Sequence, residues 1–342
     1  MGTILRPKLH GVMKRAADHL VPFQVSIELT HRCNLRCTHC YVDTRSPREM
    51  TLKECTVVLD QLADAGTMYL MFTGGEVLVR EDFMDIAWYA RNRGFLLTIL
   101  TNGTLLTPAT AYELALLEPV QVGLSLHGAC SQTHDAITGV PGSFDRLMEA
   151  IRLLKHHEVT VGLQGNVMDS NVHEIPDIKA LGTKLGVNVH LSSEFVPGKS
   201  GSMEPFGHEA ASQQLCKGMG QQWIEESQAA AKVGPCKAGK GICSVAPNGD
   251  VFPCLLMPMK IGNLLETGFQ ELWKTHPCKE LEQLRSVTAD DMTECKACAI
   301  AAFCHRCMGV AYSETGSVTS PAPTACRNAH LKYSYITQRK EV

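Results

Sequence analysis

Three cysteines stand close together near the start of the 342-residue sequence, in the segment Cys33-Asn-Leu-Arg-Cys37-Thr-His-Cys40. Thiolates with three and then two residues between them can bind three irons of a 4Fe–4S cluster, and the fourth iron then stays open to another ligand. Zinc with a histidine ligand, His31 or His39, is an alternative, and so is chance spacing. We interpret Cys33, Cys37 and Cys40 as ligands of an iron–sulfur cluster.

A second and larger group of cysteines lies in the last third of the chain. Their short, repeated spacing is typical of metal ligands in a reducing compartment, where disulfides are disfavoured. The group has eight members: Cys236, Cys243, Cys254, Cys295, Cys298, Cys304, Cys307 and Cys326. Eight thiolates suit two closed clusters of four ligands each. Zinc is again the alternative, because paired Cys-x2-Cys units also bind zinc.

Four further cysteines lie outside these spacings. Cys55 is on the apolar face of a predicted helix and is expected in the core, and Cys278 is expected to cap or pack. Cys216 could replace Cys307 as a cluster ligand. Cys130 follows a predicted strand and is a candidate catalytic residue.

The sequence around the first cysteines of the second group predicts a β-hairpin. An Asn-Gly turn at 248–249 between two β-rich runs favours a two-residue loop. Such a loop places Cys243 opposite Cys254, at a distance that suits two ligands of one cluster. A bulge at Pro253 would shift this register by one residue.

The elements that must position these residues alternate between strands and helices. Short β-rich runs predict strands at 25–29, 69–72, 96–101, 120–125, 160–167 and 187–194. One of the amphipathic helices between them starts with a capping box formed by Thr51 and Glu54. Repeated strand–helix units give parallel strands in a partial (β/α) barrel or a doubly wound sheet. Polar residues alternate with apolar ones at Ser26, Glu28 and His190, which favours a partial (β/α)6 barrel with a polar lumen.

Composition and charge restrict the class of protein. Hydrophobic residues make up 44% and charged residues 20% of the chain, which is typical of a globular protein. The formal net charge of −3 gives no electrostatic reason to expect a nucleic acid or an anionic membrane as a partner. No apolar run is long enough to span a membrane, and the N-terminus does not read as a signal peptide. We therefore expect a cytoplasmic protein.

The same patterns divide the chain into four parts. An N-terminal arm, residues 1–22, precedes the barrel of residues 23–200. A connector, residues 201–234, has helical patterns at 209–215 and 221–231. The cysteine-rich module of residues 235–342 has few apolar residues, so metal is expected to supply part of its folding energy.

The first cysteine segment and the aromatic Tyr41 after it resemble the signature of radical S-adenosylmethionine (SAM) enzymes. The GGE segment at 74–76 resembles a second motif of that family, and polar motifs follow later strands at 101–103, 123–128, 166 and 194–197. All of them fall at the carboxyl ends of predicted strands, where barrels place their active sites. The resemblance implies reductive cleavage of SAM to a 5′-deoxyadenosyl radical, which abstracts hydrogen from a substrate.

The resemblance also implies which residues meet SAM. The open iron would bind the amino and carboxylate groups of the cofactor. Gly74 and Gly75 would let the backbone approach it closely, and Glu76 would accept hydrogen bonds from its ammonium group. The other residues implied to border SAM are Tyr41, Asn102, Ser125, Asn166, Phe195 and Pro197.

The cysteine-rich module resembles the SPASM domain, the auxiliary-cluster extension of radical SAM peptide and protein maturases. The resemblance assigns one auxiliary 4Fe–4S cluster to Cys236, Cys243, Cys254 and Cys307. It assigns the other to Cys295, Cys298, Cys304 and Cys326. Cys307 departs from the family pattern, because two residues in place of three separate it from Cys304.

These resemblances imply an enzyme that modifies a peptide or small protein, for example by an oxidative cross-link. A radical SAM enzyme for a tetrapyrrole or another small molecule is the first alternative, and a non-catalytic iron–sulfur electron carrier or zinc-binding protein is the second. Expected partners are the substrate, a separate recognition protein, and an electron donor such as flavodoxin or ferredoxin. The acid–base residue of the final step stays open, and the candidates are His127, Cys130, His190 and Glu194.

Overall fold

The computed structural model describes residues 5–42, 48–228 and 234–338. The described strands form a single sheet in the order β6-β5-β4-β3-β2-β1-β7-β8-β9. In chain order they are β1 (Gln24–Thr30), β2 (Tyr69–Gly74), β3 (Leu96–Thr101), β4 (Gln121–Ser125), β5 (Val161–Asn166), β6 (Asn188–Ser192), β7 (Ile242–Val245), β8 (Asp250–Phe252) and β9 (Gly262–Asn263). The strands from β6 to β7 in this order are parallel, and β8 and β9 continue the sheet in antiparallel pairs.

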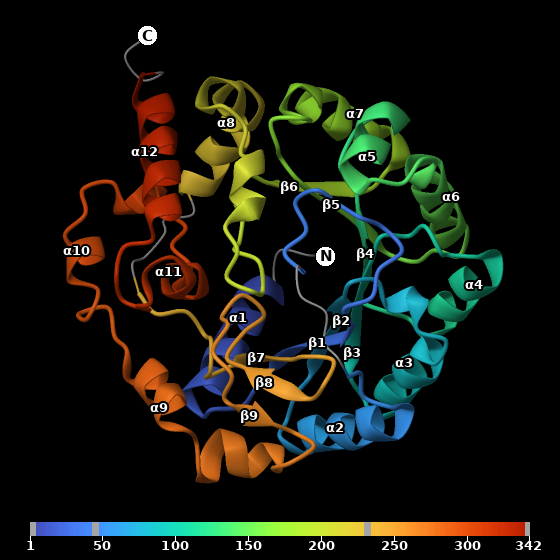
Figure 1. Ribbon diagram of the computed structural model, residues 1–342, viewed down its shortest axis with the longest axis vertical. Coiled ribbons are helices and arrows are strands. Elements are labelled where there is room, and N and C mark those ends of the chain that lie inside the picture. The colour runs from blue at the N-terminus through green and yellow to red at the C-terminus, as the bar shows by residue number, and fades with distance from the viewer. Residues whose placement is uncertain (1–4, 43–47, 229–233, 339–342) are drawn as a thin grey trace.

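Helices surround the parallel strands in an arc (Figure 1). They are α2 (Leu52–Asp64), α3 (Phe83–Asn92), α4 (Pro108–Leu116), α5 (Ser131–Thr138), α6 (Ser143–His156) and α7 (Ile175–Leu185), with short turns η1 (Val77–Val79) and η2 (Val172–Glu174). Val25 and Ile27 of β1 belong to one apolar core with Val58 and Leu62 of α2. The capping box of Thr51 and Glu54 is present at the start of α2, as predicted.

The predicted fold class is confirmed within the described residues. Each strand predicted in the barrel is found, and its ends differ from the prediction by at most two residues. Strand β6 has a neighbour on one side only, so the barrel is open at this edge. Because this edge is open, residues of β6 lie near solvent, whereas the sequence predicted that they face a polar lumen.

The connector differs from the prediction. In place of two short helices, the structure has η3 (Glu204–His208) followed by one continuous helix, α8 (Ser212–Gln228). Leu215, Met219 and Trp223 of α8 are buried, and the Trp223 ring lies 6.3 Å from that of Tyr335. Buried residues on one face make this segment part of the folded body. The predicted helix end at 231 lies outside the described residues.

The hairpin register also differs from the prediction, by one residue. Val245 pairs with Val251, so the loop contains the three residues 247–249. Gly249 supplies the extra residue in a left-handed conformation, with φ of +87°, as three-residue hairpin loops require. Cys243 and Cys254 are therefore offset by one position, and the predicted direct opposition is wrong.

The cysteine-rich module shares its core with the barrel. Val245, Val251 and Trp273 belong to the same apolar core as β1 and α2, and Cys243 of β7 pairs with Val25 of β1. The module continues with η4 (Glu271–Thr275), α9 (Lys279–Ser286), α10 (Thr293–Lys296), η5 (Ala301–Phe303), α11 (Met308–Thr315) and α12 (Pro323–Gln338). A smaller apolar cluster, which includes Ala238, Met257 and Met308, lies within the module itself. The main core thus extends across residue 235, and the division there stays a prediction from the sequence pattern.

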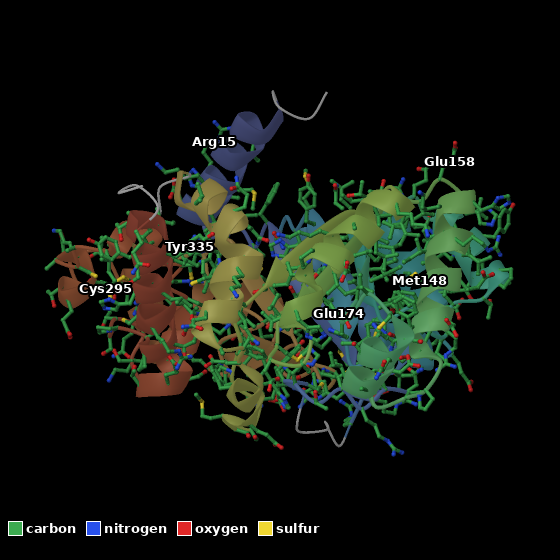
Figure 2. All side chains as sticks on the ribbon, turned by 90° about the horizontal axis from the view of Figure 1, so that it is seen from above. Arg15, Met148, Glu158, Glu174, Cys295 and Tyr335 are labelled. Carbon is green, nitrogen blue, oxygen red and sulfur yellow. The ribbon has the colours of Figure 1, made fainter. Side chains whose placement is uncertain are left out.

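The ends of the molecule are seen best from above. Helix α1 (Leu5–Asp18), which carries Arg15, projects from the body, and Cys295 lies at the opposite end from Glu158 (Figure 2). Over the described ranges, we find no helix with the length and apolar character needed to cross a membrane.

Candidate active site and metal centres

The loop after β1 brings three thiols to the carboxyl ends of the parallel strands. Cys33, Cys37 and Cys40 all line one cavity of about 630 Å³. Burial, together with the neighbouring Cys40 and Cys33, raises the pKa of the Cys37 thiol to about 12. Three thiols around one cavity fit a 4Fe–4S cluster with one open iron, because bound iron supplies the positive charge that stabilises thiolates.

Hydrogen bonds from two sides fix this loop in place. The amides of Arg36 and Thr38 donate to the carbonyls of Thr138 and Ile137, at 2.8 and 3.0 Å, so the loop rests on the end of α5. Asn102 Nδ2 at the end of β3 lies 3.8 Å from the Cys33 sulfur. Donors near a ligating sulfur orient it and tune its charge.

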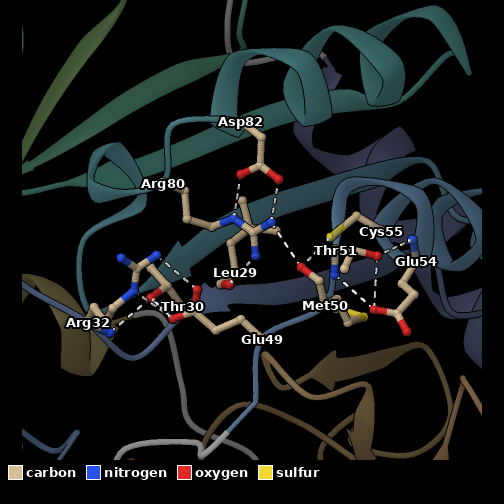
Figure 3. Close-up of polar contacts among 10 residues, drawn as sticks. All are labelled: Leu29, Thr30, Arg32, Glu49, Met50, Thr51, Glu54, Cys55, Arg80 and Asp82. Carbon is tan, nitrogen blue, oxygen red and sulfur yellow. Dashed lines mark hydrogen bonds and ion pairs between the residues drawn. The ribbon is translucent and has the colours of Figure 1, made fainter.

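A buried guanidinium joins the two ends of the cluster loop, and no sequence motif indicated it. The Arg80 side chain donates to the carbonyls of Leu29 and Met50, both at 3.0 Å (Figure 3). Leu29 lies just before the loop and Met50 just after it. Asp82 holds the guanidinium from a third side, at 2.7 and 2.9 Å. Arg80 therefore fixes the distance between the strand and the helix that flank the loop.

We expect Arg80→Met to lower the free energy of unfolding by about 2–4 kcal/mol, because it removes the charged donor from two buried carbonyls. Iron bound per chain should fall as well, since the loop ends separate more easily. Urea unfolding under anaerobic conditions and iron analysis measure the two effects. Arg152→Met is the control, since Arg152 pairs with Glu149 at an exposed position. Wild-type iron content and stability in Arg80→Met would contradict the role of this contact.

Most residues implied to border SAM line the same cavity as the three thiols. They are Tyr41, Gly74, Gly75, Asn102, Ser125, Asn166 and Phe195. They come from the ends of β1 to β6, as the alignment of motifs with strand ends predicted. Gln164, from β5, also faces this cavity.

The structure gives Gly74 and Gly75 a packing role in addition to the implied close approach to SAM. A Cβ at Gly74 would lie 2.2 Å from the carbonyl oxygen of Thr30, and one at Gly75 would lie 2.3 Å from that of Arg32. The close neighbour is thus the backbone of the cluster loop. Gly74 and Gly75 allow β2 to pack directly against this loop, although both also line the cavity.

Glu76 is placed differently from the expected contact with SAM. Its side chain is 1% exposed and accepts hydrogen bonds from Thr101 Oγ1 at 2.6 Å and from the amides of Asn102 and Leu78 at 2.6 and 3.0 Å. Burial raises the pKa of Glu76, while these hydrogen bonds oppose the rise. Glu76 therefore joins the ends of β2 and β3 from behind the cavity wall.

The cavity wall contains one of the four candidate acid–base residues, His127. Its ring is buried, and its centroid lies 4.7 Å from that of His39 in the cluster loop. Burial lowers the pKa of His127, and His39 lowers it further, so the imidazole is neutral near pH 7. His127 can therefore accept or donate a hydrogen bond at the cavity without carrying charge.

The other three candidates lie away from the cavity. Cys130 is exposed at the start of α5, with its sulfur 3.7 Å from a carboxylate oxygen of Glu174. His190 in the edge strand β6 is exposed, and so is Glu194 after it. Polar and apolar residues alternate in β6 as predicted, but the open edge of the barrel exposes the polar ones to solvent.

A second cavity of about 280 Å³ lies between the barrel and the hairpin, and Pro197 lines it. His31 and Tyr41 line both cavities and so form the wall between them. Behind this wall, Lys199 Nζ lies 2.6 Å from the buried carboxylate of Glu28. Burial raises the pKa of Glu28, but contacts with His31 and Lys199 outweigh this effect and the net direction is down. Lys199 was missed because its segment, rich in glycine and serine, shows no motif.

The eight C-terminal cysteines form two groups in space, and all fifteen cysteines are free thiols. Burial, together with the nearby Cys307 and Cys236, raises the pKa of Cys254 to about 12. Cys243 also interacts with Cys254. Cys216 packs against the barrel core in α8, so Cys307 is the residue that the fold brings to this group.

The second group lines a cavity of its own. Cys295, Cys298, Cys304 and Cys326 border about 480 Å³ at the outer end of the molecule, where Figure 2 shows Cys295. Burial, together with the three other thiols, raises the pKa of Cys304 to about 11. Cys295, Cys298, Cys304 and Cys326 thus provide, around one cavity, the four thiols that a closed cluster needs. The division of the eight cysteines between two clusters stays a prediction.

Comparison with known proteins identifies the family. A family model described as the radical SAM superfamily matches residues 27–181, and one described as an iron–sulfur cluster-binding domain, SPASM, matches residues 236–299. The mycofactocin maturase MftC of Mycolicibacterium smegmatis is 30% identical over 310 residues, which cover 83% of this chain and 78% of that protein. The chain belongs to the radical SAM superfamily. As a radical SAM enzyme with a SPASM domain, it uses SAM and iron–sulfur clusters, so the predicted family and cofactors are confirmed.

Two further similarities extend over most of this radical SAM enzyme. The AdoMet-dependent heme synthase of Methanosarcina barkeri is 28% identical over 345 residues, which cover 88% of this chain and 95% of that protein. The structure of Streptococcus suis SuiB bound to precursor peptide SuiA aligns with a TM-score of 0.70 at 17% identity, over 96% of this chain and 82% of SuiB. At this identity the structural match shows the fold alone, and it confirms a barrel followed by a SPASM domain.

Proposed function

We propose that this radical SAM enzyme modifies a peptide or small protein by an oxidative reaction. The observation that carries the proposal is the position of Leu255 and Leu256, which follow Cys254 and line the same cavity as Cys33, Cys37 and Cys40. A substrate in this cavity would meet the SAM site on one side and, on the other, the two leucines that directly follow the auxiliary cysteine Cys254. Such a position suits hydrogen abstraction followed by loss of an electron to an auxiliary cluster.

In this proposal the chain's own residues bind and orient the reactants. Cys33, Cys37 and Cys40 hold the cluster that, with SAM bound, supplies the 5′-deoxyadenosyl radical. Ser125 and Asn166 offer polar contacts to SAM, while Tyr41 and Phe195 border its adenine. Leu255 and Leu256 cover the cavity and exclude water from the substrate. Eight further cysteines form two auxiliary 4Fe–4S sites, one of Cys236, Cys243, Cys254 and Cys307 and one of Cys295, Cys298, Cys304 and Cys326.

The relatives support a peptide substrate and also a second candidate. MftC is named a maturase, and SuiB was crystallised with a precursor peptide. The similarity to a heme synthase over nearly its whole length favours a tetrapyrrole as the alternative substrate class. We further propose a flavodoxin or ferredoxin as electron donor, a separate peptide-recognition protein as partner, and the cytoplasm as location.

The two substrate classes can be separated by one experiment. The anaerobically reconstituted protein is incubated with SAM, dithionite and either the small peptides encoded beside its gene or an iron-bound coproporphyrin. Mass spectrometry then follows the mass of each substrate together with 5′-deoxyadenosine. A substrate-dependent mass loss in a peptide supports the proposal. A mass change in the tetrapyrrole alone, with unmodified peptides, overturns it in favour of the alternative.

A further inference from the structure

A half-buried guanidinium lies beside the first auxiliary group of cysteines. Arg285 of α9 stacks on Trp273, with 4.6 Å between the guanidinium carbon and the ring. Its Nη1 donates to the Trp273 carbonyl at 2.7 Å, and its Nε donates to the Gly239 carbonyl at 2.5 Å. Nη2 is buried and has no hydrogen-bond partner among the residues that the structure describes. The charged guanidinium of Arg285 is thus fixed by two hydrogen bonds, and the N–H groups of its Nη2 can still donate.

The contact with Gly239 connects Arg285 to the backbone next to both cysteines of the hairpin, Cys243 and Cys254. The Gly239 amide donates to the carbonyls of Ile242 and Pro253, at 3.1 and 3.0 Å. Ile242 directly precedes Cys243, and Pro253 directly precedes Cys254. Arg285 therefore reaches the backbone beside two ligands through a single intervening residue.

Arg285 also interacts electrostatically with one of these ligands. This ligand is Cys243 of β7, and Arg285 is the cationic side chain that acts on its thiol. The Cys243 side chain is 2% exposed, so water screens this interaction little. The free Cys278 at the start of α9 lies near Arg285 as well.

We propose that Arg285 is a positioning residue that raises the reduction potential of the auxiliary cluster held by Cys236, Cys243, Cys254 and Cys307. This inference rests on the proposed function, which assigns these ligands. Reduction adds one electron, supplied by oxidation of the substrate, and therefore one negative charge. A cation fixed in a poorly screened interior stabilises the more negative state, and hydrogen bonds to sulfur act in the same direction.

The test is a redox titration followed by electron paramagnetic resonance. It uses the full chain with Cys33, Cys37 and Cys40 changed to alanine, so that only the auxiliary signals remain. Arg285→Met removes the charge at similar length and should make one midpoint potential more negative. At a fixed potential the ratio of oxidised to reduced cluster should rise at least about tenfold, which is about 59 mV for one electron. The second auxiliary cluster serves as an internal reference and should not change.

A charge-conserving variant and a second neutral variant of Arg285 complete the design. Arg285→Lys keeps the cation, so the oxidised-to-reduced ratio should stay within about threefold of the wild-type value. Should Arg285→Met fail to fold, Arg285→Gln takes its place, because it keeps a donor for Gly239. Equal potentials in wild-type and the neutral variant, or a Lys variant that matches the neutral one, would overturn the role of Arg285.

The ligand assignment is tested separately. Cys243→Ala should remove one auxiliary signal and its iron, whereas Cys278→Ala should retain both signals. Retention of the two signals in Cys243→Ala would refute the assigned ligands, and with them this part of the proposed function. Loss of one signal in Cys243→Ala, together with an unshifted potential in the neutral variant, would refute only the inference on Arg285.

Discussion

Replacement of Cys33, Cys37 and Cys40 by alanine is expected to lower the formation of 5′-deoxyadenosine from SAM by at least about a thousandfold. The three thiols line one cavity at the ends of the parallel strands. In the proposed function these thiols are the ligands of the cluster that transfers an electron to SAM. Without that electron transfer, the activation free energy of SAM cleavage rises by several kcal/mol. Chromatography of anaerobic reactions with dithionite measures the nucleoside directly.

The matched control for this prediction is another cysteine that the fold keeps away from the cavity. Cys55 of α2 faces the apolar core and is 2% exposed. Cys55→Ala should keep 5′-deoxyadenosine formation within about twofold of the wild-type rate, as expected for a small change in a core that stays folded. Continued SAM cleavage in the triple variant would remove the basis for the cluster site and for the proposed function.

Gly75→Ala is expected to destabilise the protein by about 3 kcal/mol or more and to prevent cluster binding. The new methyl group would lie 2.3 Å from the Arg32 carbonyl oxygen and 2.9 Å from that of His31. Both atoms belong to the backbone that leads into the cysteine loop, so relief of the collision must move that loop. Thermal unfolding and iron analysis after anaerobic reconstitution measure the two effects.

Gly268→Ala is the control for the glycine prediction. A Cβ at Gly268 has open space around it, with nothing within 4 Å. The substitution should therefore leave stability and iron content near the wild-type values, or raise stability slightly by restricting the unfolded chain. A Gly75→Ala protein with normal iron content would show that the loop can shift without consequence, and the packing argument would then be wrong.

The barrel could be predicted from the sequence because its signals are local. Each strand shows β-rich residues over a short run, and Thr51 with Glu54 marks the start of α2 through contacts within one turn. Spacing alone also grouped Cys33, Cys37 and Cys40, since short loops keep neighbouring residues together. The motif residues met at one cavity because parallel strands end at the same edge.

Features that depend on distant backbone atoms could not be predicted. Arg80 and Arg285 donate to main-chain carbonyls, and any residue type can supply such an acceptor. The hairpin register depended on whether Gly249 adopts a left-handed conformation, which the sequence permits but does not require. His190 was placed in the lumen because alternation gives the face of a strand but not whether another strand covers it.

The position of β1 in the sheet has a consequence for the synthesis of the protein. On one side β1 pairs with β2, and on the other with β7, where Gln24 is matched with Ile242. At a translation rate of roughly 5–20 residues per second, this second partner leaves the ribosome about 10–40 s after β1. During that interval a strand of the nascent chain has an uncovered edge, which favours aggregation. Slow growth at low temperature with chaperones in excess should therefore raise the yield of protein that can be loaded with iron.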